Sequence, residues 1–465
     1  MAGDDLTKRI FSLSWPIVIT QMLNMFYNLT DAFWIGNLEG TAAVAAIQIS
    51  GPVYGMIVAI GFGFSSAAVA LISQYTGARL DERASHTSSQ IIGTTFLFSL
   101  LLAVIGYLLT PYLVAFLNVE AAVSIKSIAY IRIIFLGLPL MFMTMVCDGI
   151  FRGRSRMILS MVIMSVSVII NIVLDPLFIE GYSFFPALGI SGAAIATVIS
   201  YAFSAMISLW ILHSGRMGVK VDMAEMKPKG MEVRGIMRIG LPAMIGQGGS
   251  SMGFFFLMYV IALVPNATVA LAGYGIGDRL MSMITMLSTG IGAACTTMVG
   301  EALGREDVSY AEKTVRRALE LAFSLSCLLA LVAVVFRSQF VGAFINDAAA
   351  IEEGSSFIAL FAFGMPFFAV FSIANGAFAG SGHNVPAMVT ELARLIAIRV
   401  PLSYALGIAL GMGSEGIWLG MAVSNVAAAV MGVILLGTDG WKKRVIEPIE
   451  TMGEVYEEAR ERSPP

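Results

Sequence analysis

Charge is scarce in this sequence. Asp, Glu, Lys and Arg make up only 13% of the residues, whereas hydrophobic residues make up 57% and the mean hydropathy is +0.84. Soluble domains carry about 25% charged residues, so the composition excludes a water-soluble globular fold. The formal net charge of −3 also gives no reason to expect a nucleic-acid partner.

Cysteine and histidine are rare, with three residues of each. The cysteines lie inside apolar stretches, which argues against a structural disulfide or a zinc site. The histidines lie in or beside polar loops and lack the spacing of metal ligands. An intramembrane enzyme requires a nucleophile, an acid or metal ligands at the water boundary, so the sequence predicts neither an enzyme nor a cofactor. The three cysteines are Cys147, Cys295 and Cys327, and the three histidines are His86, His213 and His383.

Long apolar stretches dominate the chain, and many exceed the about 20 residues that a transmembrane helix requires. None shows the period of two that barrel strands require. Lys8 and Arg9 lead directly into the first stretch without a small-residue cleavage pattern, so we expect this span to be retained. The sequence therefore predicts an all-α polytopic membrane protein with twelve transmembrane helices, near 10–35, 47–74, 87–110, 126–151, 157–179, 189–213, 234–263, 269–300, 313–336, 355–379, 386–410 and 416–437.

The loop charges predict the orientation of these spans. When the loops are assigned alternately to the two sides, one side carries nearly all of the loop Lys and Arg, among them Arg79, Arg154 and Lys229. The opposite loops carry mainly acids, such as Glu120 and Glu353. Cytoplasmic loops are enriched in Lys and Arg, so we expect both termini in the cytoplasm of a prokaryotic cell, with the spans in its inner membrane.

The two halves of the chain resemble each other at an offset of about 226 residues. Pro16 aligns with Pro242, and Gln21 with Gln247. Residues 63–77 align with 290–304, so that Gln74 corresponds to Glu301. Two further segments correspond in order: 148–153 with 375–380, and 189–200 with 413–424. Four ordered matches indicate an internal repeat.

A repeat of six spans inserts both halves in the same sense, which is the parallel-repeat plan of transporters. We predict two pseudo-symmetric six-helix bundles, with the substrate chamber between them. The expected boundaries are 1–213 for the N-terminal lobe, 214–232 for a cytoplasmic linker, 233–437 for the C-terminal lobe and 438–465 for a cytoplasmic amphipathic tail.

Residues 63–77, their repeat at 290–304, and the first-span run 16–31 followed by Trp34-Ile-Gly36 resemble the multidrug and toxic compound extrusion (MATE) family. The resemblance covers nearly the whole chain. It implies a MATE-type fold and a cation-driven antiporter that expels organic, often cationic or amphipathic, compounds by alternating access. The implied partners are a small organic substrate, membrane lipid and a coupling ion, H⁺ and/or Na⁺. We expect a monomer, while the sequence leaves the oligomeric state open.

Within that family, one set of residues is similar to the DinF-like branch, whose cation site lies in the N-terminal lobe. These residues are Asp31, Tyr130, Asn171, Asp175 and Thr197. Spacing adds that Asn171 and Asp175 share a helix face, as do Ala193 and Thr197. Their oxygens suit Na⁺ at Asp31, Asn171, Asp175 and Thr197. Because neighbouring buried carboxylates disfavour joint ionisation, a proton and Na⁺ would compete there.

Structural roles remain open for the same residues. Asp31 can cap hydrogen bonds near a helix end, and Asp175 precedes Pro176, where a helix often ends. Pro16 permits a bend in the first helix, either fixed or changing during transport. Six further residues are candidates for an N-lobe hydrogen-bond network and substrate contacts, or for ordinary helix packing: Gln21, Asn24, Tyr27, Asn28, Tyr130 and Asp148.

The second lobe does not repeat the carboxylate cluster. It carries instead Asp278, Arg279, Glu391, Arg394 and Arg399 within its spans, as structural ion pairs or as substrate contacts. A flippase for a lipid-linked substrate is the main alternative function, although chamber arginines look scarce for a pyrophosphate ligand. A channel is disfavoured because nothing resembles a filter loop. The exported substrate and the choice between Na⁺ and H⁺ stay open.

Overall fold

The structure is a computed structural model of the chain. It describes residues 2–39, 41–116, 120–181 and 186–446. The side chains of residues 2–4, 28, 31, 32, 39, 41, 42, 44 and 116 are not among those described. The predicted tail helix falls almost entirely on 447–465, outside the described residues.

The prediction of twelve transmembrane helices is confirmed, because the described residues contain twelve helices that are long and apolar enough to cross a membrane. The described residues contain no strand. The first half comprises α1 (Ala2–Glu39), α2 (Thr41–Gly77), α3 (Asp81–Phe116), α4 (Ala121–Gly153), α5 (Met157–Ile179) and α6 (Ile190–His213). The second half begins with α7 (Gly230–Ile261), α8 (Ala267–Gly304) and α9 (Val308–Val335), followed by the short α10 (Arg337–Gly342).

The tenth and eleventh spans are interrupted. The tenth comprises α11 (Ala348–Phe361), a 3-10 turn η2 (Ala362–Gly364) and α12 (Met365–Ser381). The eleventh comprises α13 (Asn384–Leu392), a π-helical segment η3 (Ala393–Arg399), α14 (Val400–Tyr404) and a second π-helical segment η4 (Ala405–Ala409). The last span is α15 (Gly413–Leu436). π-Helical segments often occur at functional sites.

Local chemistry explains several helix ends. The side chain of Asp307 accepts a hydrogen bond from the Tyr310 amide and caps α9, and Asp347 caps α11 through the Ala350 amide in the same way. Gly382 adopts φ = +78° directly after α12, a left-handed conformation that glycine adopts without strain. These caps fix short connections between successive spans.

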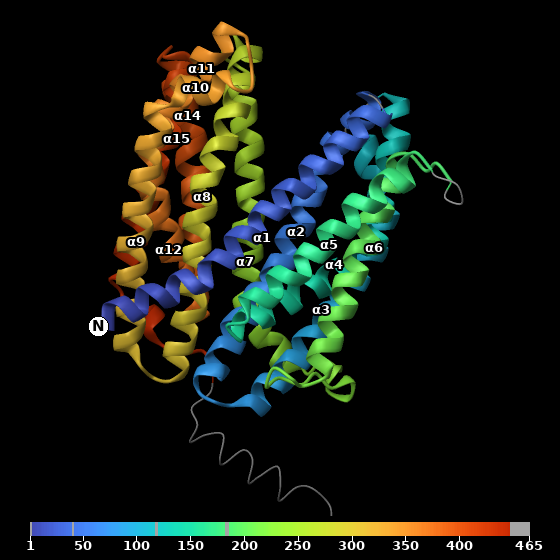
Figure 1. The fold of residues 1–465 in the computed structure, drawn as a ribbon, viewed down its shortest axis with the longest axis vertical. Coiled ribbons are helices and arrows are strands. Elements are labelled where there is room, and N and C mark those ends of the chain that lie inside the picture. The colour runs from blue at the N-terminus through green and yellow to red at the C-terminus, as the bar shows by residue number, and fades with distance from the viewer. Residues whose placement is uncertain (1, 40, 117–119, 182–185, 447–465) are drawn as a thin grey trace, which may run out of the picture.

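Two bundles diverge from a common base (Figure 1). α1 runs obliquely between them: Ile10 and Leu13 belong to a hydrophobic cluster with α8 and α12, whereas Ile35 belongs to a cluster with Ile179 and Ala193 of the first half. α7 behaves in the equivalent way, because Ile236 packs with α2 and α3 and its other end packs with α8 and α15. Both crossing helices therefore belong to both lobes.

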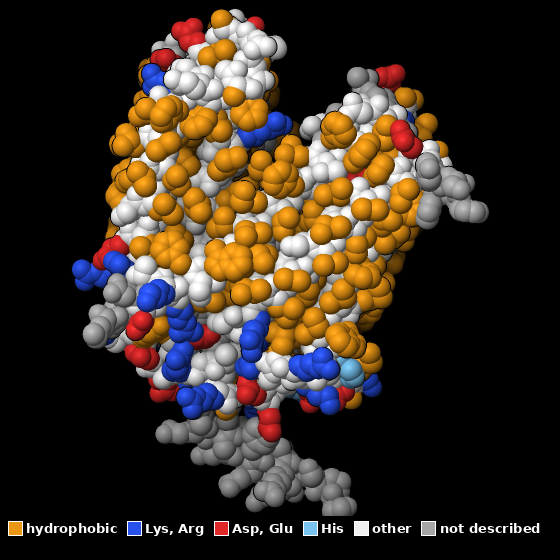
Figure 2. Space-filling view, in the orientation of Figure 1, with side chains coloured by type: hydrophobic (Ala, Val, Ile, Leu, Met, Phe, Trp, Pro, Cys, Tyr) orange, Lys and Arg blue, Asp and Glu red, His pale blue; other side chains and the backbone are white. Residues whose placement is uncertain are grey.

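The surface charges separate along the long axis. Lys and Arg gather at the end of the molecule where the two bundles meet, which we call the basic end (Figure 2). A broad apolar belt covers the middle of the same face. At the opposite end, the space-filling surface is hollowed between the two lobes. The structure therefore has an interlobe cleft that is open at the end opposite the basic end.

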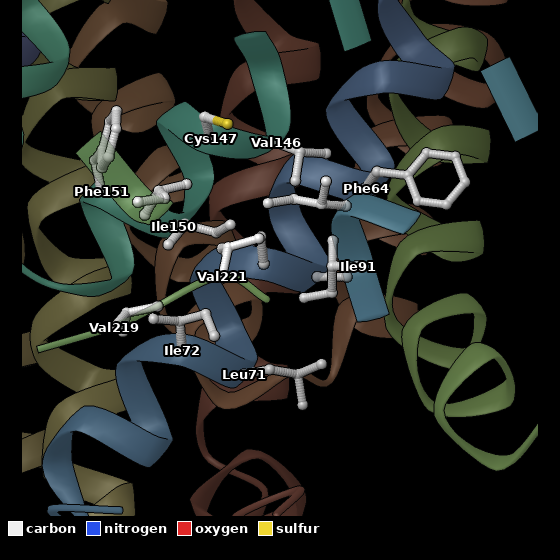
Figure 3. Packing of buried hydrophobic residues seen from close by; sticks show 14 of the residues in the cluster. Phe64, Leu71, Ile72, Ile91, Val146, Cys147, Ile150, Phe151, Val219 and Val221 are labelled. Carbon is white, nitrogen blue, oxygen red and sulfur yellow. The ribbon is translucent and has the colours of Figure 1, made fainter. Parts of the chain in front are cut away.

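The segment between the halves is attached to the first lobe rather than extended as a free tether. Val219 and Val221 are buried in a cluster with Ile72, Ile91 and Phe151 (Figure 3). Gln90 of α3 holds the backbone of the next stretch: its side chain donates to the carbonyls of Glu225 and Lys227 and accepts from the Lys229 amide. This stretch includes the 3-10 turn η1 (Met223–Met226).

Candidate cation site in the first lobe

The centre of the candidate site lies on α5. Asn171 and Asp175 are both fully buried, and Asn171 Nδ2 donates a hydrogen bond of 3.1 Å to Asp175 Oδ1. The two residues are one helical turn apart, so the same face of α5 carries both. Pro176 lies inside α5 and does not end it, since the helix continues to Ile179. Asp175 therefore lies about one turn before the end of the helix rather than beyond it.

The register between α5 and α6 places two more of the predicted residues beside this pair. Ser167 Oγ donates to the carbonyl oxygen of Ser200 at 3.0 Å and fixes the two helices against each other. Because these helices are antiparallel and both rise about 1.5 Å per residue, one turn along brings Asn171 level with Thr197. A second turn brings Asp175 level with Ala193. Thr197 and Ala193 are buried.

α1 supplies the third wall. The hydroxyl of Tyr27 donates a 2.7 Å hydrogen bond to Thr197 Oγ1, and both side chains are buried. Asp31 follows Tyr27 by one turn on the same helix, which puts its position at the level of Asp175 and Ala193. The side chains of Asp31 and Asn28 lie outside the described residues. Tyr130 of α4 is half-buried and packs against the cluster that contains Ala193.

The polar atoms of this cluster suit a small hard cation or a proton. Asn171 Oδ1 is buried and accepts no hydrogen bond from any described residue. An unsatisfied buried acceptor costs about 1–3 kcal/mol, which a cation or a donor at this point would recover. Carboxylate, amide and hydroxyl oxygens are the ligands that hard cations select. The described part of the chain contains no group of three or more His, Cys, Asp or Glu side chains that could hold a metal ion, so any cation here would also need the amide and hydroxyl oxygens.

The structure separates Asp148 from this site. Asp148 forms an ion pair of 2.9 Å with Arg152 and accepts a hydrogen bond from Ser160, near the start of α5. Asp175 lies fifteen residues further along α5, or about 22 Å at the helical rise. Asp148 therefore takes part in a local network near the basic end, and the carboxylates do not form one cluster.

Other polar residues of α1 have different surroundings. Gln21 Nε2 donates to Thr289 Oγ1 of α8 at 3.0 Å, so it joins α1 to the second lobe. Asn24 is exposed. Pro16 is buried inside a helix that continues through it. Sequence reasoning named Gln21 but missed its partner Thr289, because only the packing of helices reveals contacts between distant spans.

The charged residues of the second lobe form a separate buried network. Arg394 pairs with Glu391 at 2.6 Å, and Glu391 also accepts a hydrogen bond from Ser250 of α7. Asn425 Oδ1 of α15 accepts from Arg399 at 2.7 Å and from Arg394 at 3.4 Å. Both arginines are buried, which fits structural ion pairs better than exposed substrate contacts.

Two charged residues of α8 differ in how far they are exposed. Asp278 is half-buried and interacts electrostatically with Arg399, so it belongs to the same network. Arg279 is exposed. The network therefore links α7, α8, η3 and α15, and the π-helical turn η3 carries its two arginines.

Comparisons with known proteins match both halves of this chain. The MatE family model matches residues 16–177 and 242–405, one match in each half of the chain. A probable multidrug resistance protein NorM of Thermotoga maritima is 23% identical over 454 residues, covering 97% of this chain and 96% of the relative.

Two solved structures have nearly the same fold. The outward-facing conformation of a multidrug resistance MATE family transporter has a TM-score of 0.86 at 23% identity and covers 92% of this chain and 95% of its own. A transporter of the MOP superfamily from Pyrococcus furiosus, whose binding pocket is described as having reverse polarity, has a TM-score of 0.86 at 23% identity, covering 94% and 97%.

Proposed function

Because the chain belongs to the MatE family of membrane transporters, we propose that it is a cation-coupled antiporter that exports organic, cationic or amphipathic compounds. Relatives along nearly the full length are named multidrug resistance or multidrug export proteins. The coupling ion is H⁺ and/or Na⁺. Export proceeds by alternating access, with the interlobe cleft as the chamber.

One observation carries this proposal: a carboxylate and an amide are fully buried together in the membrane, on one face of α5. An ionised side chain at the centre of a bilayer helix costs about 2.5–3.5 kcal/mol or more, and a purely structural role would favour an apolar residue. The Asn171–Asp175 pair lies against α6, where Thr197 bonds Tyr27 of α1. Cation binding at Asp175 would therefore change contacts among three helices of one lobe.

In this proposal, the loop charges indicate how the protein is oriented in the membrane. The positive-inside rule assigns the basic end to the cytoplasm, so the termini are cytoplasmic and the cleft is open to the outside. In this state, a proton or Na⁺ from outside can reach the first lobe and displace bound drug. The cation would leave after the chamber has opened to the cytoplasm, and drug would enter in its place.

The test is dye efflux in proteoliposomes under separately imposed Na⁺ and pH gradients. We expect Asp175→Asn to lower gradient-driven efflux at least tenfold while the protein still inserts and folds, because an amide cannot exchange a proton and binds Na⁺ more weakly. Asp148→Asn is the matched control, since its carboxylate lies near the basic end with Arg152 and Ser160.

Full efflux in Asp175→Asn would remove the site from the mechanism. Movement of a lipid-linked substrate without any effect of either gradient would favour the flippase alternative instead.

A further inference from the structure

The repeat has a counterpart in three dimensions at the basic end. α2 and α8 cross where the aligned pairs Gln74/Glu301 and Gly77/Gly304 occur. A Cβ atom added to Gly77 would overlap the carbonyl oxygen of Glu301, and one added to Gly304 would overlap the carbonyl oxygen of Gln74. Each glycine thus admits the backbone of the equivalent helix in the other half, so the two approaches are reciprocal.

The aligned polar side chains also reach across to equivalent places. Gln74 Nε2 donates to the carbonyl oxygens of Gly380 and Ser381, at 3.2 and 3.1 Å, where α12 ends. Glu301 accepts a hydrogen bond from Ser155 Oγ at 2.5 Å, in the loop between α4 and α5. Residues 148–153 align with 375–380. Gln74 and Glu301 therefore bind equivalent loops, each in the half of the chain opposite its own.

The two contacts differ in charge. The Glu301 carboxylate is only 6% exposed and also pairs with Arg9 of α1 and with Arg305 at 3.1 Å. The two arginines therefore neutralise this carboxylate and hold it facing Ser155. Gln74 is uncharged and fully buried, and its Oε1 accepts from the Val445 amide at 2.9 Å, after the last span.

We propose that Gln74 and Glu301 form a pseudo-symmetric latch that holds the basic end closed while the cleft is open at the other end. The proposal rests on alternating access in the proposed function, but not on which cation drives transport. Opening the basic end must separate α2 from the α12 end and α8 from the α4–α5 loop. That opening would break all of these interlobe hydrogen bonds. The bonds therefore stabilise the present conformation relative to the conformation that is open at the basic end.

The experiment measures the conformational equilibrium directly, by double electron–electron resonance on detergent-purified protein without drug or gradient. Spin labels at Glu82→Cys and Ser309→Cys report on the basic end, and labels at Glu120→Cys and Thr268→Cys report on the cleft end. All four positions are exposed. Cys327 is replaced by Ser because it is exposed, whereas Cys147 and Cys295 are buried.

Two variants each break one half of the latch with little change of shape. Gln74→Glu replaces an amide donor by a carboxylate that faces two carbonyl oxygens, and Ser155→Ala removes the donor to Glu301 but leaves both arginines in place. We expect each to lower the ratio of cleft-open to basic-end-open molecules about tenfold, which corresponds to about 1.4 kcal/mol. The double variant should shift the ratio further than either single variant, without strict additivity, because the two halves of the latch meet at one helix crossing.

Matched controls make the same two kinds of substitution, Ser to Ala and Gln to Glu, at positions outside the latch. Ser165→Ala loses a hydrogen bond within α5, to the Met161 carbonyl, and Gln48→Glu changes an exposed side chain. Both should leave the two distance distributions unchanged. Distributions in Gln74→Glu and Ser155→Ala that match these controls would overturn the latch. If Asp175→Asn proves harmless while the latch variants shift the equilibrium, the cation site fails and the latch stands.

Discussion

Replacing Asn425 tests whether the charged network of the second lobe is structural. Asn425→Leu keeps the branched shape of a fully buried side chain but removes the oxygen that accepts from both Arg394 and Arg399. Of these two bonds, the one from Arg399 at 2.7 Å carries most of the energy, because the one from Arg394 is 3.4 Å long.

The size of the effect follows from what each arginine keeps. Arg399 retains Ser424 Oγ at 2.9 Å and Arg394 retains Glu391, so neither guanidinium becomes wholly unpaired. A hydrogen bond to a charged group contributes about 1.5–3 kcal/mol net, and a partner left unsatisfied adds to the loss. We expect Asn425→Leu to lower the free energy of unfolding by about 2–4 kcal/mol.

The assay is unfolding in mixed detergent micelles, followed by tryptophan fluorescence, since Trp418 is fully buried in the same lobe. Asn37→Leu is the control: Asn37 is exposed, and its side chain donates to the carbonyl of Phe33 on its own helix. Equal stability of the two variants would refute the structural assignment. Intact stability of Asn425→Leu with lost efflux would instead indicate that the network contacts substrate.

Two further predictions concern glycine and histidine. Alanine normally stabilises a helix by about 1 kcal/mol relative to glycine. Gly77→Ala should nevertheless destabilise the protein, because the added Cβ would overlap the Glu301 backbone. Gly235→Ala, with open space around it, should be neutral or stabilising in the same unfolding assay. Burial, with Arg238 and Lys443 nearby, lowers the pKa of His383. The unfolded chain therefore binds this proton more readily, and stability should fall as the pH drops through about 6.5. His383→Gln should show a smaller loss of thermal stability between pH 7.5 and 5.5.

Hydropathy predicted the number of helices because each span must satisfy its own backbone hydrogen bonds in lipid. It could not predict the breaks in the tenth and eleventh spans, since η2, η3 and η4 differ from the flanking helices in hydrogen-bond register, which hydropathy does not report. The docked linker was missed for a related reason. Val219 and Val221 alternate with Lys220 in a short polar stretch, and a period-two signal of that length resembles a loop.

For the candidate site, helix periodicity alone put Asn171 beside Asp175, because residues four apart share a face. The interhelical register was not predictable, since it depends on contacts such as Ser167 with Ser200 and Tyr27 with Thr197. Asp148 illustrates the opposite case. Its residue type suggested membership of the same network, but its pairing with Arg152 is decided by position along α4.

The two halves keep the same backbone contacts and differ in where charge is placed. Gly77 and Gly304 make equivalent close approaches, yet the first lobe has the buried carboxylate Asp175 in its centre and the neutral Gln74 at its basic end. The second lobe has neutralised ion pairs in its centre and the carboxylate Glu301 at its basic end. The repeat relates the two lobes to each other, so in the proposed cycle the shared packing cannot itself make one lobe respond to the cation differently from the other. The unequal distribution of carboxylates supplies that difference without altering the packing that the repeat shares.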